Sequence, residues 1–347
     1  MKHTMLTTSI IMVFIFIIFL FTGCPDTEND NPTAVPTHQN TPEPLPIKKL
    51  TKIGTWTTSY SSGYVAFNVF VSGIYAYLAF GEAGLQIIDI SNPSNPVLVS
   101  TCNTTGPLRD VFVFGNYAYA ATSESGLEII DVSDVANPFI TSSYNTGGYT
   151  YGVYYSENVI YLADGSNGLT IINVSDPLNP VFQSSYRMPV NANDNDVVVS
   201  GIYSYYANNS GGLQILNISN PLMPIVFGVF DENINAYDVC ISGDYVYIAD
   251  YSYGLKIFDV ANKTNPKLSG SIQSIGLPHR LFIKDDYAYI ASWGNLEIIN
   301  ISNQSNPSAE AFYNQDGYNI RGVFVVEEYI YVAQAYGDNA LVIFTWE

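Results

Sequence analysis

The heptapeptide Gly-Leu-Gln-Ile-Ile-Asp-Ile at residues 84–90 decides the fold, because close copies of it recur along the chain. The next two copies are Gly-Leu-Glu-Ile-Ile-Asp-Val at 126–132 and Gly-Leu-Thr-Ile-Ile-Asn-Val at 168–174. Seven copies occur, and their leading leucines are Leu85, Leu127, Leu169, Leu213, Leu255, Leu296 and Leu341. These leucines are 41 to 45 residues apart, a period typical of the blades of a β-propeller.

Each copy carries the pattern of four short strands. Ahead of the leucine strand, an apolar run such as 111–113 (Val-Phe-Val) precedes a turn at 115–116 (Gly-Asn) and a second run at 117–119 (Tyr-Ala-Tyr), which predicts a hairpin. After the leucine strand, a loop such as 89–96 holds an Asp or Asn and prolines, residues that close turns and end a ladder. A fourth run follows, with an apolar or aromatic residue at its end and Ser, Gly or Ala two positions earlier. Each copy is therefore predicted to be a four-stranded sheet.

The seventh copy lacks a fourth strand, because the chain ends at Glu347. Residues 52–56 (Lys-Ile-Gly-Thr-Trp) match the missing strand, with Gly54 at the small position and Trp56 at the aromatic one. We therefore predict an all-β protein whose single folded domain, residues 50–347, is a seven-bladed β-propeller of four-stranded blades. The N-terminal strand is expected to complete the last blade and close the ring, which protects the sheet edges.

The Leu-x-Ile-Ile-Asp-Val-Ser core, seen best at 85–91 and 127–133, resembles the LVIVD-repeat family of bacterial and archaeal surface proteins. The resemblance implies a propeller fold and a surface location rather than a particular chemistry. Some copies depart from the motif, and these departures are Asn173, Asn217 and Asn300 in place of Asp, and Ala261 in place of Ser.

Residues 1–23 are organised like a lipoprotein signal peptide. Lys2 precedes an apolar stretch at 10–21 and then Thr-Gly-Cys at 22–24, the charged start, apolar middle and small-residue exit of such a peptide. The end resembles the bacterial lipobox, with Phe21 where leucine is usual, and this implies cleavage before Cys24 and its acylation, for example with palmitate. We therefore expect a lipid anchor in the bacterial cell membrane or the outer membrane. A plain secretory peptide and an uncleaved anchor are the alternatives.

Residues 24–49 are predicted to be a disordered tether that follows the lipidated cysteine. Pro, Thr, Asn and acidic residues dominate from 25 to 46, and such a composition buries too little apolar surface to fold. Proline-rich spacers are semi-rigid, so this segment would hold the propeller away from the membrane.

The formal net charge of −19 argues against a nucleic-acid partner, because phosphate binding needs a basic surface. An acidic surface keeps a secreted protein soluble, and we expect a monomer. Cys102 and Cys240 fall in distant blades, farther apart than the ~7 Å between Cα atoms that a disulfide permits, so they are expected to be unpaired and buried.

Two columns of residues are expected at the top face of the ring, around the central channel. Aligning the copies places in the first column Phe67, Arg109, Tyr151, Asn195, Tyr237, His279 and Arg321. The second column holds Asn68, Asp110, Gly152, Asp196, Asp238, Arg280 and Gly322. Both columns change residue type from blade to blade, as an asymmetric binding surface requires. Our candidate ligand-binding residues are Arg109, Asp110, Tyr151, Asp196, Tyr237, Asp238, His279, Arg280 and Arg321.

The chemistry of this face leaves alternatives open. His279, Arg280 and Arg321 are suited to capturing a carboxylate or sulfate through charge-assisted hydrogen bonds. The same groups also balance the charges of Asp196 and Asp238. All of these residues are equally compatible with solvated loop residues that pair locally, for example Arg109 with Asp110.

Neither a catalytic set nor a metal or cofactor site is predicted. His279 is the only histidine in 50–347, and no Gly-x-Ser-x-Gly elbow accompanies it. The Asn and Asp residues of 191–196 resemble a calcium loop but lack its glycine and closing glutamate. We therefore expect a non-enzymatic binding or scaffold module for a protein or a glycan. The alternative is an envelope hydrolase or lyase that uses channel-facing Asp and Arg side chains.

Overall fold

The structure is a computed structural model that describes residues 48–58, 64–188, 196–335 and 339–346. The predicted signal peptide, Cys24 and nearly all of the tether lie outside the described residues, as do 191–195 of the calcium-like segment. Every strand lies within residues 44–347, which form one compact unit.

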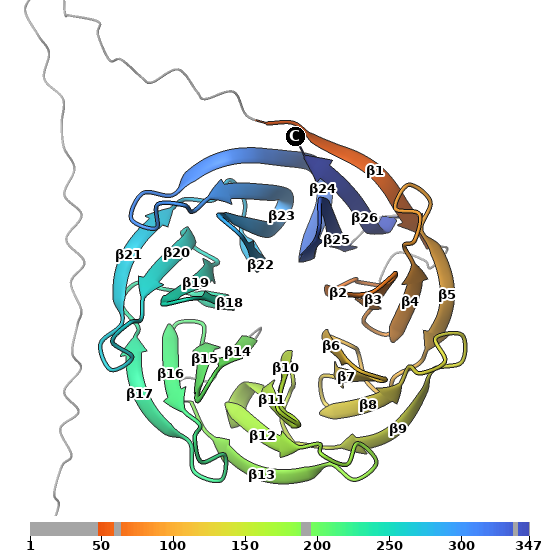
Figure 1. Cartoon of the computed structure of the whole chain (residues 1–347), viewed down its shortest axis with the longest axis horizontal. Helices are drawn as coiled ribbons and strands as arrows, with labels where there is room; N and C mark the ends of the chain where they lie inside the picture. Colours follow the sequence, from red (N-terminus) through yellow and green to blue (C-terminus); the bar gives the residue numbers. More distant parts are fainter. Residues whose placement is uncertain (1–47, 59–63, 189–195, 336–338, 347) are drawn as a thin grey trace, which may run out of the picture. The chain divides into compact units, whose positions relative to one another are not determined.

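Five blades are separate four-stranded antiparallel sheets whose strands pair in chain order (Figure 1). Blade 1 comprises β2 (Asn68–Ser72), β3 (Tyr75–Ala79), β4 (Leu85–Asp89) and β5 (Val97–Cys102). Blade 2 comprises β6 (Asp110–Phe114), β7 (Tyr117–Ala121), β8 (Leu127–Asp131) and β9 (Phe139–Tyr144). Blade 3 comprises β10 (Gly152–Ser156), β11 (Val159–Ala163), β12 (Leu169–Asn173) and β13 (Val181–Tyr186). Blade 4 comprises β14 (Asp196–Ser200), β15 (Tyr203–Ala207), β16 (Leu213–Asn217) and β17 (Ile225–Phe230). Blade 5 comprises β18 (Ala236–Ser242), β19 (Tyr245–Asp250), β20 (Gly254–Asp259) and β21 (Lys267–Ile272).

The last two blades share longer strands within one sheet. Its members are β22 (Pro278–Lys284), β23 (Tyr287–Asn300), β24 (Ser308–Val326), β25 (Tyr329–Ala335), β26 (Asn339–Trp346) and β1 (Leu50–Thr57). The first half of β23 pairs with β22 and its second half with β24, so β23 supplies two strands of blade 6. Beyond residue 319, β24 pairs with β25 and becomes the innermost strand of blade 7.

The ring closes as the sequence predicts. Strand β1 pairs antiparallel with β26, with Trp56 opposite Leu341 and Thr55 opposite Val342 (Figure 1). Trp56 is buried and contacts Phe80 of blade 1 at a ring-centroid distance of 6.2 Å. The prediction of a seven-bladed propeller closed by the N-terminal strand is therefore confirmed.

The hydrophobic core lies between neighbouring blades rather than at the centre of the ring. One cluster, for example, joins Leu85 and Ile87 of blade 1 to Val111 and Ala118 of blade 2. Each repeat leucine is fully buried, which stabilises the fold by about 1.5–3 kcal/mol per side chain. The recurring tyrosines are also buried, which confirms that they serve packing: Tyr77, Tyr119, Tyr161, Tyr205, Tyr247, Tyr289 and Tyr331.

The small residue near the end of each fourth strand has a structural cause, because a loop of the next blade lies against it. The hydroxyl of Ser142 donates to the carbonyl oxygen of Pro177 at 2.6 Å, and Ser184 does the same to Pro221 at 2.6 Å. At Gly54, a Cβ atom would lie 1.9 Å from the carbonyl oxygen of Pro93. A larger side chain would therefore separate adjacent blades.

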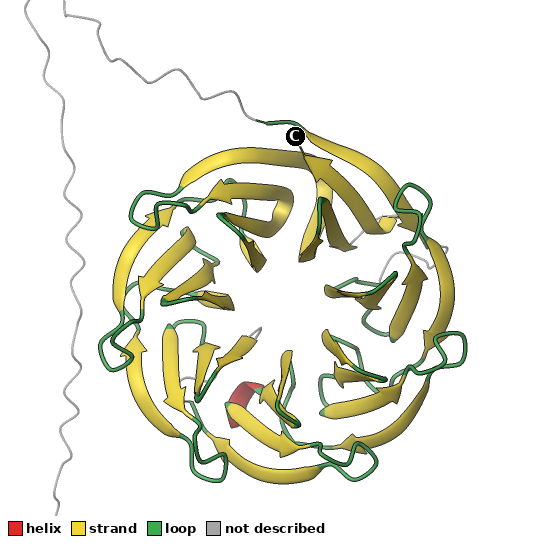
Figure 2. Cartoon of the chain, viewed as in Figure 1, coloured by secondary structure: helices red, strands yellow, loops and turns green. Residues whose placement is uncertain are grey.

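Within the described residues the one helical element is a short 3-10 turn, η1 (Gly165–Asn167), drawn in red in Figure 2. No described helix is long and apolar enough to cross a membrane. Cys102 and Cys240 are free; Cys102 is buried, and Cys240 is half-buried with its Sγ 3.4 Å from the carbonyl oxygen of Leu281.

Candidate functional site

The innermost strand of each blade lines the central channel (Figure 1). The two predicted columns lie in or directly before these strands, at equivalent positions of each blade. We call the described residues of the first column the upper ring: Phe67, Arg109, Tyr151, Tyr237, His279 and Arg321. The second column forms the lower ring: Asn68, Asp110, Gly152, Asp196, Asp238, Arg280 and Gly322. All nine candidate residues therefore lie around one axis, and Asn195 of the first column lies outside the described residues.

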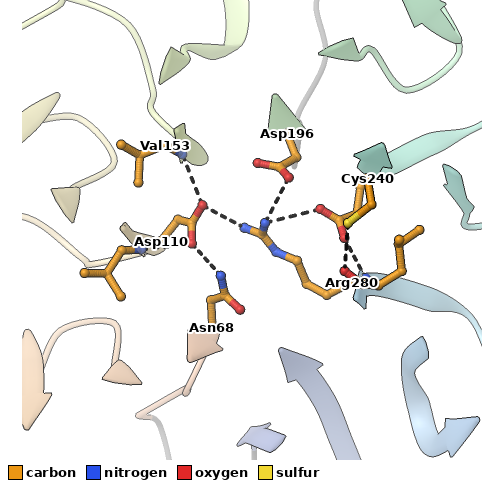
Figure 3. A network of polar contacts seen from close by, with 9 residues as sticks. Asn68, Asp110, Val153, Asp196, Cys240 and Arg280 are labelled. Carbon is orange, nitrogen blue, oxygen red and sulfur yellow. Dashed lines mark hydrogen bonds and ion pairs between the residues drawn. The ribbon is translucent and has the colours of Figure 1, made fainter. Parts of the chain in front are cut away.

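In the lower ring, Arg280 extends across the channel toward three carboxylates (Figure 3). Its Nη2 lies 3.4 Å from Oδ2 of Asp110, and its Nη1 lies 3.3 Å from both Oδ2 of Asp196 and Oδ1 of Asp238. One arginine of blade 6 thus joins blades 2, 4 and 5 through the centre of the ring.

The carboxylates of the lower ring have further partners that fix them in place. Asp110 accepts hydrogen bonds from the side-chain amide of Asn68 at 2.5 Å and from the backbone N–H groups of Val111 at 2.9 Å and Val153 at 3.1 Å (Figure 3). Asp238 accepts a 2.6 Å hydrogen bond from the backbone N–H of Leu281. The bonds from Asn68, Val153 and Leu281 cross from blade to blade, so the network holds neighbouring blades in register.

Burial and ion pairing act in opposite directions on the titration of these groups. Burial raises the pKa of Asp196 well above its ordinary value; Arg280 opposes this shift, and the neighbouring Asp238 adds to it. Burial also raises the pKa of Asp110 against the effect of Arg280. Burial lowers the pKa of Arg280, but the three carboxylates outweigh it and raise the pKa above the ordinary value. Arg280 is therefore permanently charged, and burial makes Asp196 easier to protonate than an exposed carboxyl.

In the upper ring, Arg109 lies over the face of Phe67, with its guanidinium carbon 4.3 Å from the ring centroid. Its Nη2 donates to the hydroxyl of Tyr149 at 2.9 Å, and its Nε donates to Oγ of Ser123 at 3.2 Å. Stacking on an aromatic face stabilises a guanidinium without neutralising it. Arg109 thus keeps its positive charge at the rim of the channel.

Arg321 approaches the same phenyl ring from blade 7, with its guanidinium carbon 5.9 Å from the centroid of Phe67. Its Nε is buried and has no hydrogen-bond partner among the described residues. Within that part of the chain, no carboxylate lies within ion-pair distance of Arg109 or Arg321. The upper ring therefore holds two arginines that have no carboxylate partner among the described residues.

His279 completes the upper ring and is neutral. Only 9% of the residue is exposed, and its ring lies 5.9 Å from that of Tyr237, 5.6 Å from that of Tyr251 and 6.5 Å from that of Trp293. Burial, with Arg321 and Arg280 nearby, lowers the pKa of His279 to about 3. Its Nε2 is buried without a hydrogen-bond partner among the described residues. The sequence pattern grouped His279 with the arginines as a basic residue, whereas the structure makes it an uncharged imidazole.

These residues enclose a cavity of about 40 Å³ that opens at the top of the channel. Its lining consists of the upper ring and Arg280, which forms its floor. A water molecule needs roughly 10–15 Å³ of such volume, so the cavity has room for one small polar group. Asp110, Asp196 and Asp238 do not line it; they border a second cavity of about 190 Å³ lower in the channel.

The walls of the lower cavity are a third column that the sequence analysis did not single out. This column consists of Phe70, Phe112, Tyr154, Val198, Cys240, Phe282 and Phe324. Neighbouring rings touch, with centroid distances of 4.9 Å for Phe70 and Phe112 and 4.7 Å for Phe282 and Phe324. The signal was present in the sequence, because these residues follow the lower-ring residues by two positions in every copy.

Comparison with known proteins places the chain by its repeats. The sequence profile of the LVIVD repeat matches residues 63–104, 105–146, 147–188, 193–232, 235–274 and 276–315, more than half of the chain. The copy around Leu341 lies beyond these matches. No curated protein sequence matches the chain.

Among solved structures, the chain is similar to the β-propeller domain of Cps50 (Swd1) from Myceliophteria thermophila, with a TM-score of 0.69 and 11% identity over 86% of this chain and 99% of that one. It is also similar to the computationally designed Ika8 protein, with a TM-score of 0.62 and 7% identity over 85% of this chain and 99% of that one. At these identities the likeness concerns the fold alone.

Proposed function

The chain belongs to the LVIVD-repeat family, and from this premise we propose that it is a non-enzymatic binding or scaffold module that engages a protein or a glycan through the top face of the propeller. One observation carries the proposal. On a frame whose packing residues repeat in every blade, the residues around the axial cavity differ from blade to blade. Packing does not require such asymmetry, whereas recognition of a partner does.

The lower ring supports binding over hydrolysis. A pair of catalytic carboxylates must be free to exchange protons with a substrate, but Asp110, Asp196 and Asp238 are ion-paired to Arg280 and lie beneath the cavity. Their geometry favours a role in holding the ring together. The alternative is a hydrolase or lyase that acts through these groups, and turnover of a substrate in the experiment below would support it.

We further propose that the module works at the cell envelope as a monomer tethered by lipid. The support is the signal-peptide pattern of 1–23, the cysteine at position 24 and the proline-rich segment that follows. A tether of this kind would present the propeller to ligands at a distance from the membrane.

The test is affinity capture from an envelope extract and a glycan pool with residues 44–347, which contain every strand of the ring. The variant Arg109→Met with Arg321→Met changes the upper ring and leaves the ion-paired lower ring intact. The matched control, Lys52→Ala with Lys267→Ala, removes the same charge from exposed positions on the outer strands β1 and β21. Selective loss of one retained partner in the upper-ring variant supports the proposal. Equal capture by all three proteins, or turnover of an envelope substrate that depends on Asp238, would contradict it.

A further inference from the structure

Arginine is distributed along this chain in a way that solubility does not explain. The sequence holds four arginines, and three of them, Arg109, Arg280 and Arg321, line the axial cavity. They come from blades 2, 6 and 7, in a protein with a net charge of −19. Only Arg280 is needed to compensate the buried carboxylates of the lower ring, because it is the one that contacts them.

The positive charges of the upper ring have no ion-pair partner in the part of the chain that the structure describes. The upper ring contributes two positive charges from Arg109 and Arg321, since His279 is neutral. In the lower ring, Arg280 faces Asp110, Asp238 and the readily protonated Asp196. Burial raises the pKa of Asp196 well above its ordinary value, which reduces the negative charge that faces Arg280 in this strongly acidic protein.

Two nitrogen atoms of the upper ring, Nε of Arg321 and Nε2 of His279, are buried and have no hydrogen-bond partner among the residues that the structure describes. A buried donor that makes no hydrogen bond destabilises the folded state, so each such atom calls for an explanation. Both residues line the same cavity. An oxygen-bearing group placed there would accept hydrogen bonds from Arg321 and, in its Nε2–H tautomer, from His279.

The size and floor of the cavity restrict what this group is. Its volume of about 40 Å³ suits one small planar group, and Phe67 forms a flat aromatic wall beside both arginines. A guanidinium matches a carboxylate in a planar, paired geometry. The negative charge on the carboxylates that pair with Arg280 beneath the cavity would repel a dianion such as phosphate more than it would repel a monoanion.

An apolar surface adjoins the cavity on the same face. Trp293, which contacts His279, is 51% exposed and borders an open groove together with Tyr253 and Ile275. Large exposed apolar side chains gathered in one place mark a binding surface. A ligand whose acidic end entered the cavity would therefore have an apolar platform for its other end.

From these observations we propose that the axial cavity is a carboxylate-binding subsite, in which Arg109 and Arg321 pair with the carboxylate of an organic acid whose apolar body lies on the groove beside Trp293. This inference rests on the proposed binding function and specifies its ligand. His279 contributes a neutral hydrogen-bond donor, and Arg280 is a positioning residue that holds the floor.

The experiment is isothermal titration calorimetry of residues 44–347 at low ionic strength with four probes: phenylacetate, acetate, phenylacetamide and inorganic phosphate. We expect phenylacetate to bind most tightly and with millimolar or better affinity. Acetate lacks the apolar body, phenylacetamide lacks the charge and phosphate is dianionic, so each should bind more weakly. Phosphate binding more tightly than phenylacetate, phenylacetamide binding equally well, or no detectable binding of phenylacetate would overturn the proposal.

Variants assign the binding to the upper ring. Arg109→Met and Arg321→Met keep most of the side-chain length and should each weaken phenylacetate binding at least about tenfold, or ~1.4 kcal/mol. Arg321→Lys, which retains the charge, should recover part of the loss and serves in place of Arg321→Met if that variant fails to fold. The Lys52→Ala, Lys267→Ala control should bind as the parent does. Unchanged affinity in both methionine variants would refute the assignment.

A second readout is specific to the cavity. His279 is the only histidine in residues 44–347, so isotope-labelled histidine gives one imidazole signal in an NMR spectrum. Phenylacetate should shift that signal while it remains that of a neutral ring. Failure of this inference is distinguishable from failure of the proposed function. Capture of a partner without carboxylate binding would remove only the subsite, and carboxylate binding without capture of any partner would remove only the larger function.

Discussion

Replacing Arg280 by methionine tests the energetic role of the lower ring. Methionine keeps much of the apolar length but removes the charge that Asp110, Asp196 and Asp238 share. The side chain of Arg280 is 17% exposed, and those of the three partners are between 3% and 11% exposed, so water screens the charges only weakly. Breaking one buried ion pair costs about 3–5 kcal/mol, a large part of a typical unfolding free energy of about 5–15 kcal/mol.

The loss should depend on pH in a defined direction. Arg280 is the largest influence that lowers the pKa values of Asp110 and Asp196 against burial, so its removal raises both further above the value of about 3.9 for an unfolded chain. A folded-state pKa above the unfolded one gives stability that is complete below the unfolded pKa and is lost as the pH rises through the folded pKa. The difference in unfolding free energy between the parent and the Arg280→Met variant should therefore be small near pH 4 and large at pH 7.

Urea unfolding of residues 44–347, followed by circular dichroism at pH 4 and pH 7, measures the effect. We expect the unfolding free energy of the Arg280→Met variant to be lower than that of the parent by about 3–5 kcal/mol at pH 7. Its melting temperature should be lower by roughly 10 °C. Adding Asp196→Asn and Asp238→Asn to Arg280→Met should recover part of the loss, because two of the three stranded carboxylates are then neutral. A deficit below about 1 kcal/mol, or one equal at both pH values, would mean that the network does not stabilise the ring through charge.

Three further predictions concern the packing between blades, the charge of His279 and the lipid anchor. Gly54→Val should lower the unfolding free energy by more than about 3 kcal/mol, because the added Cβ would overlap the carbonyl oxygen of Pro93. Thr51→Val, on the exposed side of β1, is the control. If both variants are as stable in urea as the parent, the close packing of blades 7 and 1 is refuted. Since the pKa of His279 is about 3, the NMR signal of isotope-labelled His279 with phenylacetate bound should stay that of a neutral ring from pH 5 to pH 8, and a shift of this signal near pH 6 would show instead that the imidazole is a cation when the ligand binds. Cys24→Ser should release the protein from the membrane fraction and abolish labelling by a palmitate analogue; persistence in that fraction would point to an uncleaved anchor.

The fold was predictable because the same pattern of strands and turns recurs in every copy of the repeat. Gly54 and Trp56 could be matched to the fourth-strand pattern from six other examples, and the pairing of β1 with β26 followed. The positions of the upper and lower rings were predictable for the same reason: a fixed period gives each residue a fixed height along the channel. The third column, from Phe70 to Phe324, obeys the same period and was overlooked because it resembles ordinary strand content.

The partners of the ring residues were not predictable, because they come from different blades. Local pairing of Arg109 with Asp110 was one hypothesis from the sequence, but in the structure Arg109 stacks on Phe67 of blade 1. Arg280 follows Asp238 by 42 residues and Asp110 by 170, but it contacts both across the axis. Distances across the channel depend on side-chain direction and ring diameter, which the repeat period does not specify.

The sequence by itself determined the architecture, the closure of the ring and the identity of the residues that surround the axis, since each of these depends on periodicity and on local turn and strand chemistry. Only the tertiary structure decided which of those residues form ion pairs with one another and which remain available to a ligand. Three features arise where side chains from separate blades meet in a buried space. They are the neutral state of His279, the pairing of Arg280 with three carboxylates, and the lack of an ion-pair partner for Arg109 and Arg321 among the described residues. There the cost of removing a charge from water depends on what lies opposite, and that is a property of the closed ring.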